Sequence, residues 1–218
     1  MSSPTKENYL KAAYFLHQKN KTISVTDLAK EMKISTPTAN NMVKKMAAFG
    51  WVDYEKYKPI TLTNEGIKLG ALIVRKHRLS EMFLSKVMGF GWEEVHDIAE
   101  ELEHLNSNKF FERMDEILGF PSSDPHGSPI PDKNGKVQER VFLSLLSIEP
   151  EQKVKLSALK NSSKDLLFFL NKKEIKLGTE MKVIQKEQFD NSIHLLFKDG
   201  KSTVLSQQAA ACLLVELI

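Results

Sequence analysis

The stretch from residue 24 to residue 62 constrains the fold more than any other part of the chain. Ser24 or Thr26 can cap a short helix. A tight turn at residues 33–35 leads into a second helix, which Ser35 or Thr36 can cap. Pro37 is tolerated in the first turn of this second helix, because the N–H that proline lacks has no intrahelical acceptor there. Gly50 then ends the helix. Two helices joined by so short a turn predict a helix-turn-helix.

Two short strands are predicted after the second helix. Residues 51–54 and residues 60–62 each have the composition of a strand, and the loop at 55–59 would join them as a β-wing. A long helix can begin after Thr63, and an earlier helix is predicted over residues 5–19. Helix, short helix, turn, helix and wing in this order predict a winged helix-turn-helix.

Charge is distributed unevenly along the 218 residues. Residues 1–76 carry 13 Lys and Arg against 6 Asp and Glu, whereas residues 77–120 carry 4 against 10. Residues 121–218 carry 14 against 12, so the net charge of +3 conceals a basic part followed by an acidic part. The basic part suits a polyanion and the acidic part suits cations. The alternative is that both are solvated faces that bind no ligand.

The second helix of the helix-turn-helix would enter the major groove of DNA. Short polar side chains near its start can reach base edges, and lysines further along can contact phosphates. The alternative is a helical hairpin with no role in DNA binding. The candidate DNA-binding residues are Ser35, Thr36, Pro37, Thr38, Asn40, Asn41, Lys44 and Lys45.

Several classes of protein are disfavoured by the sequence. The longest apolar run, residues 209–215, is too short to cross a bilayer, and the first residues lack the pattern of a secretion signal. The single cysteine, Cys212, excludes an internal disulfide and a cysteine-based zinc knuckle. We therefore expect a cytoplasmic protein that does not associate with membranes.

The predicted secondary structure changes from helices to strands at about residue 120. Residues 92–118 predict one or two acidic helices, and residues 121–135 contain four prolines and two glycines, which indicates a linker or a loop of fixed shape. Beyond them we expect short strands at 141–146, 181–185, 193–197 and 202–205, a turn at Asp199-Gly200 and a short helix at 166–171.

The whole chain is thus predicted to be mainly α with small β. Its expected parts are a winged helix-turn-helix (1–75), a helical domain (76–120), a proline-rich linker (121–139) and a small β-barrel-like domain (140–218).

Histidines and carboxylates concentrate in the acidic part. His77 and Glu81 are four residues apart and therefore share one face of the long helix. The next helix repeats the pattern with His96, Glu100, Glu103 and His104. Packing gives no reason for such a face, and imidazole with carboxylate suits Mn²⁺, Fe²⁺, Zn²⁺, Co²⁺ or Ni²⁺. The alternative is a solvated acidic helix with incidental histidines, which is how we interpret the isolated His17, His126 and His194.

These motifs resemble the DtxR/MntR family of metal-dependent transcriptional repressors. The stretches that carry the resemblance are ENYLKAAY (7–14), STPTANNMVKKMAAFGWV (35–52), ITLTNEGIKLG (60–70), RKHRLSE (75–81), VHDIAEELEHLNS (95–107) and the loop DPHGSPIP (124–131). The resemblance implies a helical dimerisation and metal-binding domain after the winged helix. It also implies that the C-terminal region is an SH3-like (FeoA-type) β-barrel.

The resemblance also implies two sets of metal ligands. The ancillary site of iron-type members falls on His77, Glu81 and His96, and the regulatory site falls on positions 8, 100, 103 and 104. Position 100 is Glu100, as in the manganese-type branch, where the iron-type branch has a thiol. Position 8 is Asn8, which matches neither branch, and position 11 is Lys11, where the manganese type has Glu. We therefore add the neighbouring Glu7 as a candidate ligand.

The resulting hypothesis is a homodimeric repressor, not an enzyme, that senses Mn²⁺ or Fe²⁺, binds a near-palindromic double-stranded operator and controls metal-uptake genes. Hard oxygen donors favour Mn²⁺, although Zn²⁺, Co²⁺ or Ni²⁺ can bind in vitro. No small organic substrate is expected. The alternatives are an iron-dependent repressor of the DtxR branch, a metal-independent winged-helix regulator and a di-metal hydrolase.

Overall fold

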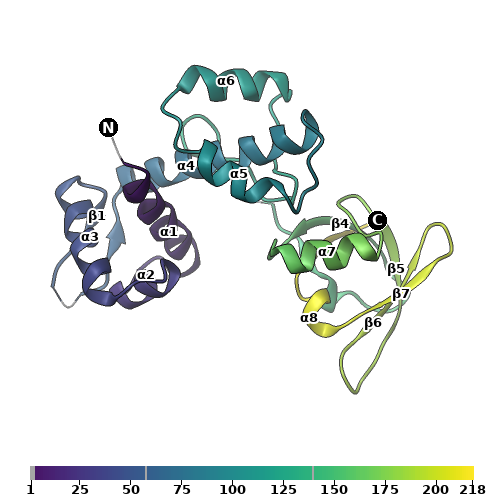
Figure 1. Ribbon diagram of the computed structural model, residues 1–218. Helices are drawn as coiled ribbons and strands as arrows, with labels where there is room; N and C mark the ends of the chain where they lie inside the picture. Colours follow the sequence, from purple (N-terminus) through teal and green to yellow (C-terminus); the bar gives the residue numbers. More distant parts are fainter. Residues whose placement is uncertain (1–2, 57, 139) are drawn as a thin grey trace. The chain divides into compact units, whose positions relative to one another are not determined.

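The computed structural model describes residues 3–56, 58–138 and 140–218, which form two compact units (Figure 1). Of the described residues, unit 1 comprises 3–56, 58–80, 99–120 and 130–138, and unit 2 comprises 81–98, 121–129 and 140–218. Within the described ranges, no helix combines the length and the apolar character that a membrane span requires.

Unit 1 begins with the predicted helix-turn-helix. Its helices are α1 (Pro4–Asn20), α2 (Val25–Glu31) and α3 (Thr36–Ala48). The Ser24 Oγ accepts a hydrogen bond from the backbone N–H of Asp27 at 2.9 Å, and the Ser35 Oγ accepts one from Thr38 at 3.3 Å. Of the two candidates for each cap, the structure therefore selects Ser24 and Ser35. Lys33 adopts a left-handed φ of 54°, which makes the sharp turn between the two helices.

The β-wing is shorter than the sequence predicted. Strands β1 (Val52–Asp53) and β2 (Thr61–Leu62) pair antiparallel with Val52 opposite Leu62. Trp51 lies outside the strand because its N–H closes the end of α3 on the Met46 carbonyl at 3.0 Å. Residue 57, in the predicted wing loop, lies outside the described residues. The wing and the three helices share one core, whose members include Leu10, Leu28, Val43, Met46 and Leu62.

Three further helices follow the wing, and the first two of them carry candidate metal ligands. They are α4 (Asn64–Lys86), α5 (Val95–Leu102) and α6 (Asn108–Ile117), so the acidic segment forms two helices. Thr63 begins α4 as predicted, since its Oγ1 accepts the N–H of Gly66 at 3.0 Å. Within unit 1, Arg75 of α4 pairs with Asp115 of α6 at 2.5 Å and donates to the Pro131 carbonyl at 2.7 Å. One guanidinium therefore holds α6 and the proline-rich segment against α4.

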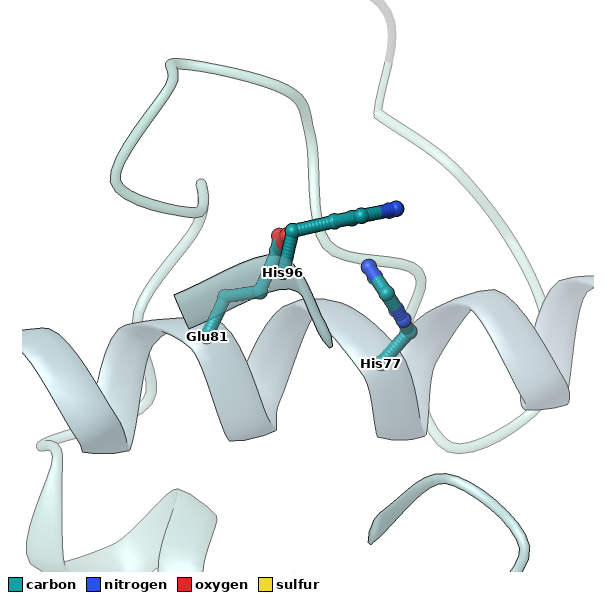
Figure 2. A group of neighbouring side chains, drawn as sticks. All are labelled: His77, Glu81 and His96. Carbon is teal, nitrogen blue, oxygen red and sulfur yellow. The ribbon is translucent and has the colours of Figure 1, made fainter. Parts of the chain in front are cut away.

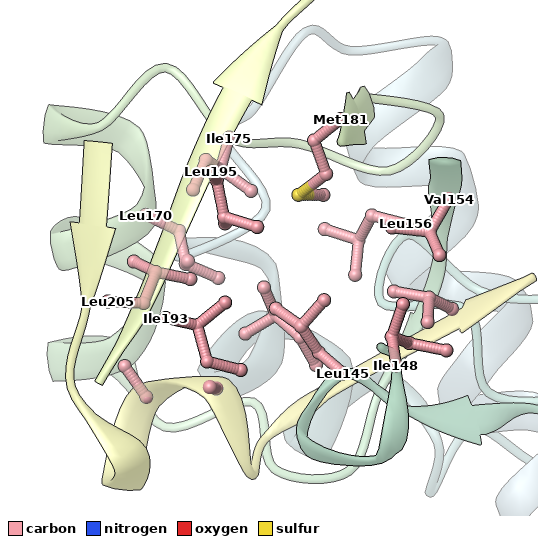
Figure 3. Packing of buried hydrophobic residues seen from close by; sticks show 14 of the residues in the cluster. Leu145, Ile148, Val154, Leu156, Leu170, Ile175, Met181, Ile193, Leu195 and Leu205 are labelled. Atoms are coloured by element: carbon pink, nitrogen blue, oxygen red, sulfur yellow. The ribbon is translucent and has the colours of Figure 1, made fainter. Parts of the chain in front are cut away.

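Unit 2 contains a six-stranded antiparallel sheet in the order β3-β8-β4-β5-β6-β7. The strands are β3 (Leu143–Ser144), β4 (Lys153–Leu159), β5 (Glu180–Lys186), β6 (Ile193–Phe197), β7 (Ser202–Leu205) and β8 (Leu213–Leu217). Helix α7 (Lys164–Lys172) contributes Leu167 and Leu170 to the core of the sheet, and the short α8 (Gln207–Ala210) contributes Ala209 and Ala210. Figure 3 shows Leu170 packed in this core with strand residues such as Leu156 and Leu195.

The sheet differs from the predicted barrel in three respects. It is not closed, because β3 pairs only with β8 and β7 pairs only with β6 among the described strands. Strands β4 and β8 were not predicted, although they lie in the middle of the sheet. The strand predicted at 141–146 is only two residues long, because Ser144 accepts the N–H of Leu146 at 3.4 Å and starts a 3-10 turn at Leu145–Ser147.

Candidate metal centre

Two neighbouring turns of α4 present His77 and Glu81, and the start of α5 presents His96 (Figure 2). Each residue offers one ligand atom, and these atoms lie within 4.8 Å of one another. The Glu81 carboxylate is 4% exposed, and its Oε1 lies 3.3 Å from Nδ1 of His96. A buried carboxylate requires a cationic or hydrogen-bonding partner, and imidazole with carboxylate is a donor set typical of divalent transition metals.

The second oxygen of Glu81 faces a histidine that the sequence did not single out. Nδ1 of His126 lies 3.8 Å from Oε2 of Glu81, and a carboxylate oxygen of Asp124 completes a fully buried trio within 4.8 Å. Nε2 of His126 donates to the Trp92 carbonyl at 2.8 Å. A neutral imidazole with its proton on Nε2 has the lone pair on Nδ1, which is the arrangement usual for a metal-binding histidine. We refer to His77, Glu81, His96, Asp124 and His126 as the Glu81 centre.

The loop DPHGSPIP holds the last two of these residues. Oδ1 of Asp124 accepts the backbone N–H groups of His126 at 2.8 Å and of Ser128 at 2.9 Å, which fixes the turn. Gly127 has a φ of +88°, and a Cβ at this position would lie 2.4 Å from the Ser157 carbonyl oxygen. The loop therefore requires glycine for two reasons, its backbone conformation and its close approach to β4.

The other predicted ligands lie in unit 1 and surround a lysine. Nζ of Lys11 is 2.6 Å from Oε1 of Glu100 and 2.7 and 2.9 Å from the two oxygens of Glu103. Lys11 is 9% exposed and the Glu103 side chain is fully buried. Nδ1 of His77 lies 2.7 Å from Oε2 of Glu103. Both oxygens of Glu103 are thus engaged by side chains, one of which is a cation.

Glu7 and His104 form a second link between α1 and the end of α5. Oε2 of Glu7 lies 2.6 Å from Nδ1 of His104, and both side chains are less than one fifth exposed. The Asn8 Oδ1 is buried and has no hydrogen-bond partner among the described residues. We refer to Glu7, Lys11, Glu100, Glu103 and His104 as the Lys11 cluster. An amide oxygen without a donor is an acceptor that a cation or a water molecule could satisfy.

Two ionisable groups beside these sites have shifted pKa values. The Lys164 ammonium lies 2.6 Å from Asp97 and lowers the pKa of that carboxyl, which keeps a negative charge next to His96. Burial raises the pKa of the Tyr9 phenol, which follows Asn8 on α1.

The candidate DNA-binding residues lie at the start of α3 and along it. Thr36, Thr38, Asn41, Lys44 and Lys45 are exposed, as are Ser35 and Pro37 at the start of the helix. Asn40 is half-buried, because its Oδ1 accepts the Tyr54 hydroxyl at 2.8 Å. This contact joins the helix to the residue that follows strand β1.

The structure divides the eight predicted ligands between two groups. His77, Glu81 and His96 belong to the Glu81 centre, and Glu7, Glu100, Glu103 and His104 belong to the Lys11 cluster, with Asn8 on the adjoining turn of α1. Sequence reasoning missed Asp124 and His126, which lie 20 and 22 residues beyond His104, the last of the predicted ligands. Their only signal was the loop motif DPHGSPIP, which contributes to the family resemblance but from which no ligand was predicted.

Comparison with known proteins agrees with this geometry. A family model described as the N-terminal DNA-binding domain of iron-dependent repressors matches residues 1–60, and one described as their metal-binding and dimerisation domain matches residues 63–132. A solved manganese-dependent transcriptional repressor in complex with manganese covers 98% of this chain and is itself covered completely, with 30% identity and a TM-score of 0.85. The chain belongs to the iron-dependent repressor (DtxR/MntR) family.

Further matches extend this family assignment. A FeoA domain model matches residues 143–217, which confirms the predicted SH3-like (FeoA-type) class of the C-terminal region. The structure of ScaR with bound Cd²⁺ is 34% identical, with a TM-score of 0.79, coverage of 98% of this chain and 99% of its own. The iron-dependent repressor IdeR of Mycobacterium leprae is 34% identical over 127 residues, which are 58% of this chain. That match spans only 55% of the relative's length.

Proposed function

We propose that this protein is a homodimeric repressor whose DNA binding responds to a divalent metal ion at the Glu81 centre. The observation that carries the proposal is the buried Glu81 carboxylate, which has His96 at one oxygen and His126 at the other. His126 donates a hydrogen bond from Nε2 to the Trp92 carbonyl, and this contact holds the ring with Nδ1 toward Glu81. A bound divalent ion would bring positive charge to this set of imidazole and carboxylate donors.

Mn²⁺ is the metal that we favour, and Fe²⁺ is the alternative. The Glu81 centre consists of imidazole nitrogens and carboxylate oxygens, and no cysteine joins it among the described residues. Such a set suits harder cations than a thiolate site does, although Zn²⁺, Co²⁺ and Ni²⁺ bind most nitrogen and oxygen sites more tightly in vitro.

We infer that α3 reads the operator. Thr36, Thr38 and Asn41 would contact base edges, and Lys44 and Lys45 would contact phosphates. A homodimer presents two copies of α3 related by a twofold axis, so we expect a near-palindromic operator. The protein would act in the cytoplasm and control metal-uptake genes.

Coupling between metal and DNA follows from linkage. Helix α4 carries His77 and Glu81 at its middle and meets the wing at its start, where Thr63 donates to the Gly50 carbonyl at 2.7 Å. A change in the orientation of α4 would therefore also move the winged helix-turn-helix that is attached to its start. A coupling of about 1–3 kcal/mol would change DNA affinity about 5- to 150-fold, and DNA would tighten metal binding by the same factor.

The test removes one imidazole of the centre. We expect His96→Ala to abolish the gain in DNA affinity that Mn²⁺ gives, measured by fluorescence anisotropy with a labelled fragment of the protein's own upstream DNA. Replacement of His194, a half-exposed histidine of β6 that contacts Glu187, serves as the matched control and should leave the gain intact. DNA affinity that is equal with Mn²⁺ and with chelator in the wild-type protein would instead support the metal-independent winged-helix regulator.

A further inference from the structure

We propose that the Lys11 ammonium is the resident cation of the Lys11 cluster and that it excludes a divalent ion from between Glu100 and Glu103. The Lys11 Nζ makes three contacts of 2.6 to 2.9 Å with carboxylate oxygens of these two residues. A metal ion bridging the same two carboxylates would have to occupy the space that Nζ fills. Lysine and metal therefore compete for one position.

Burial makes this arrangement specific. Lys11 is 9% exposed, and the Glu103 side chain is fully buried. Transfer of a charge from water is costly unless it is paired, and here each charge is the partner of the other. The ammonium is also covalently attached to α1, so its local concentration does not depend on the metal concentration of the medium.

The charges of the cluster limit the number of divalent ions that it could hold. Glu7, Glu100 and Glu103 supply three negative charges and Lys11 supplies one positive charge, which leaves a formal net charge of −2 with neutral histidines. Asn8, on the same helix, adds no charge. The cluster therefore lacks the carboxylates that would balance a pair of divalent ions.

The remaining contacts of Glu103 indicate a role other than metal binding. Its Oε2 accepts from Nδ1 of His77 at 2.7 Å, and a neutral imidazole that donates from Nδ1 carries its lone pair on Nε2. Glu103, held by Lys11, is thus a positioning residue that sets the tautomer of His77. In this assignment, Lys11 and Glu103 support the Glu81 centre without binding an ion themselves.

The experiment compares the number of Mn²⁺ ions bound per chain by the full-length protein and its variants, using the electron paramagnetic resonance signal of free Mn²⁺. We expect Lys11→Glu to bind one more ion per chain than the wild type, because it replaces the ammonium with a carboxylate. Lys11→Met should also gain an ion, at lower affinity. The exposed Lys19 of α1 provides the control, and Lys19→Glu should bind as many ions as the wild type.

A second variant, Glu100→Gln, tests the proposal while Lys11 is unchanged. Glu100 is partly exposed, so Glu100→Gln is a mild change, and we expect the wild-type number of bound ions. A lower number would show that metal displaces Lys11 and would overturn the proposal, as would equal ion numbers for the wild type and Lys11→Glu. These numbers do not involve DNA, so they are independent of the His96→Ala result.

Discussion

Lys11 and Lys44 show how the surroundings of a residue decide what its charge can do. Lys11 is buried against Glu100 and Glu103, so its ammonium forms ion pairs inside the protein. Lys44 is exposed on α3, among residues that we propose to contact DNA. The same side chain is therefore an internal cation in one helix and a potential phosphate ligand in another.

The role of Lys44 can be measured through salt. We expect Lys44→Ala to weaken binding to all DNA sequences similarly and to reduce the slope of log affinity against log salt by about one, because one phosphate contact is lost. Lys172, exposed on α7, is the control, and Lys172→Ala should leave the slope unchanged. A Lys44 variant with the wild-type slope would remove this residue from the interface.

At the scale of elements, the junction between the wing and α4 depends on a glycine. Gly66 lies in the first turn of α4, and a Cβ there would be 1.9 Å from the Trp51 carbonyl oxygen. That oxygen accepts the N–H of Thr63 at 3.0 Å, so it cannot move without loss of a hydrogen bond. The close approach of the wing to α4 is thus set by the absence of a side chain at one position.

We expect Gly66→Ala to lower the free energy of unfolding by about 1–3 kcal/mol, which is the usual cost of overpacking, even though alanine is the better helix former. Urea denaturation followed by circular dichroism measures the change. Gly91→Ala is the control, because the Cβ would meet only the flexible carboxyl end of Glu93. Equal losses in the two variants would contradict the steric explanation.

At the scale of the whole molecule, the apolar side chains exposed on unit 1 indicate how two copies associate. Leu105, Phe110, Ile117 and Phe120 are 41–70% exposed in and around α6, within the segment that matches the dimerisation domain. Large apolar side chains gathered on one element are typical of a protein interface.

Phe110→Asp should therefore shift the protein from dimer to monomer, because a carboxylate would have to be buried at the interface. Size-exclusion chromatography with light scattering measures the mass. Phe168 of α7 has a similar exposure and provides the control, so Phe168→Asp should remain dimeric. A Phe110→Asp protein that stays dimeric would place the interface elsewhere.

The sequence by itself determined the local elements and the chemical class of the candidate site. Ser24, Ser35 and Thr63 mark helix starts because their hydroxyls bond to backbone groups three residues away, an interaction that depends on local spacing alone. The four-residue spacing of His77 and Glu81 likewise placed both on one face of a helix. The β4 and β8 strands escaped prediction, since their pairing joins segments about 60 residues apart.

Only the tertiary structure decided which of these side chains meet. Lys11 and Glu103 are 92 residues apart in sequence, and their contact depends on how α1 packs against the end of α5. His126 was indistinguishable from an ordinary loop histidine until the loop brought it to Glu81. The local spacing of residues decides which of them share a face of a helix. Long-range packing decides which other element contacts that face. A metal ion or a buried lysine needs ligands or partners from several elements, so its site depends on the packing.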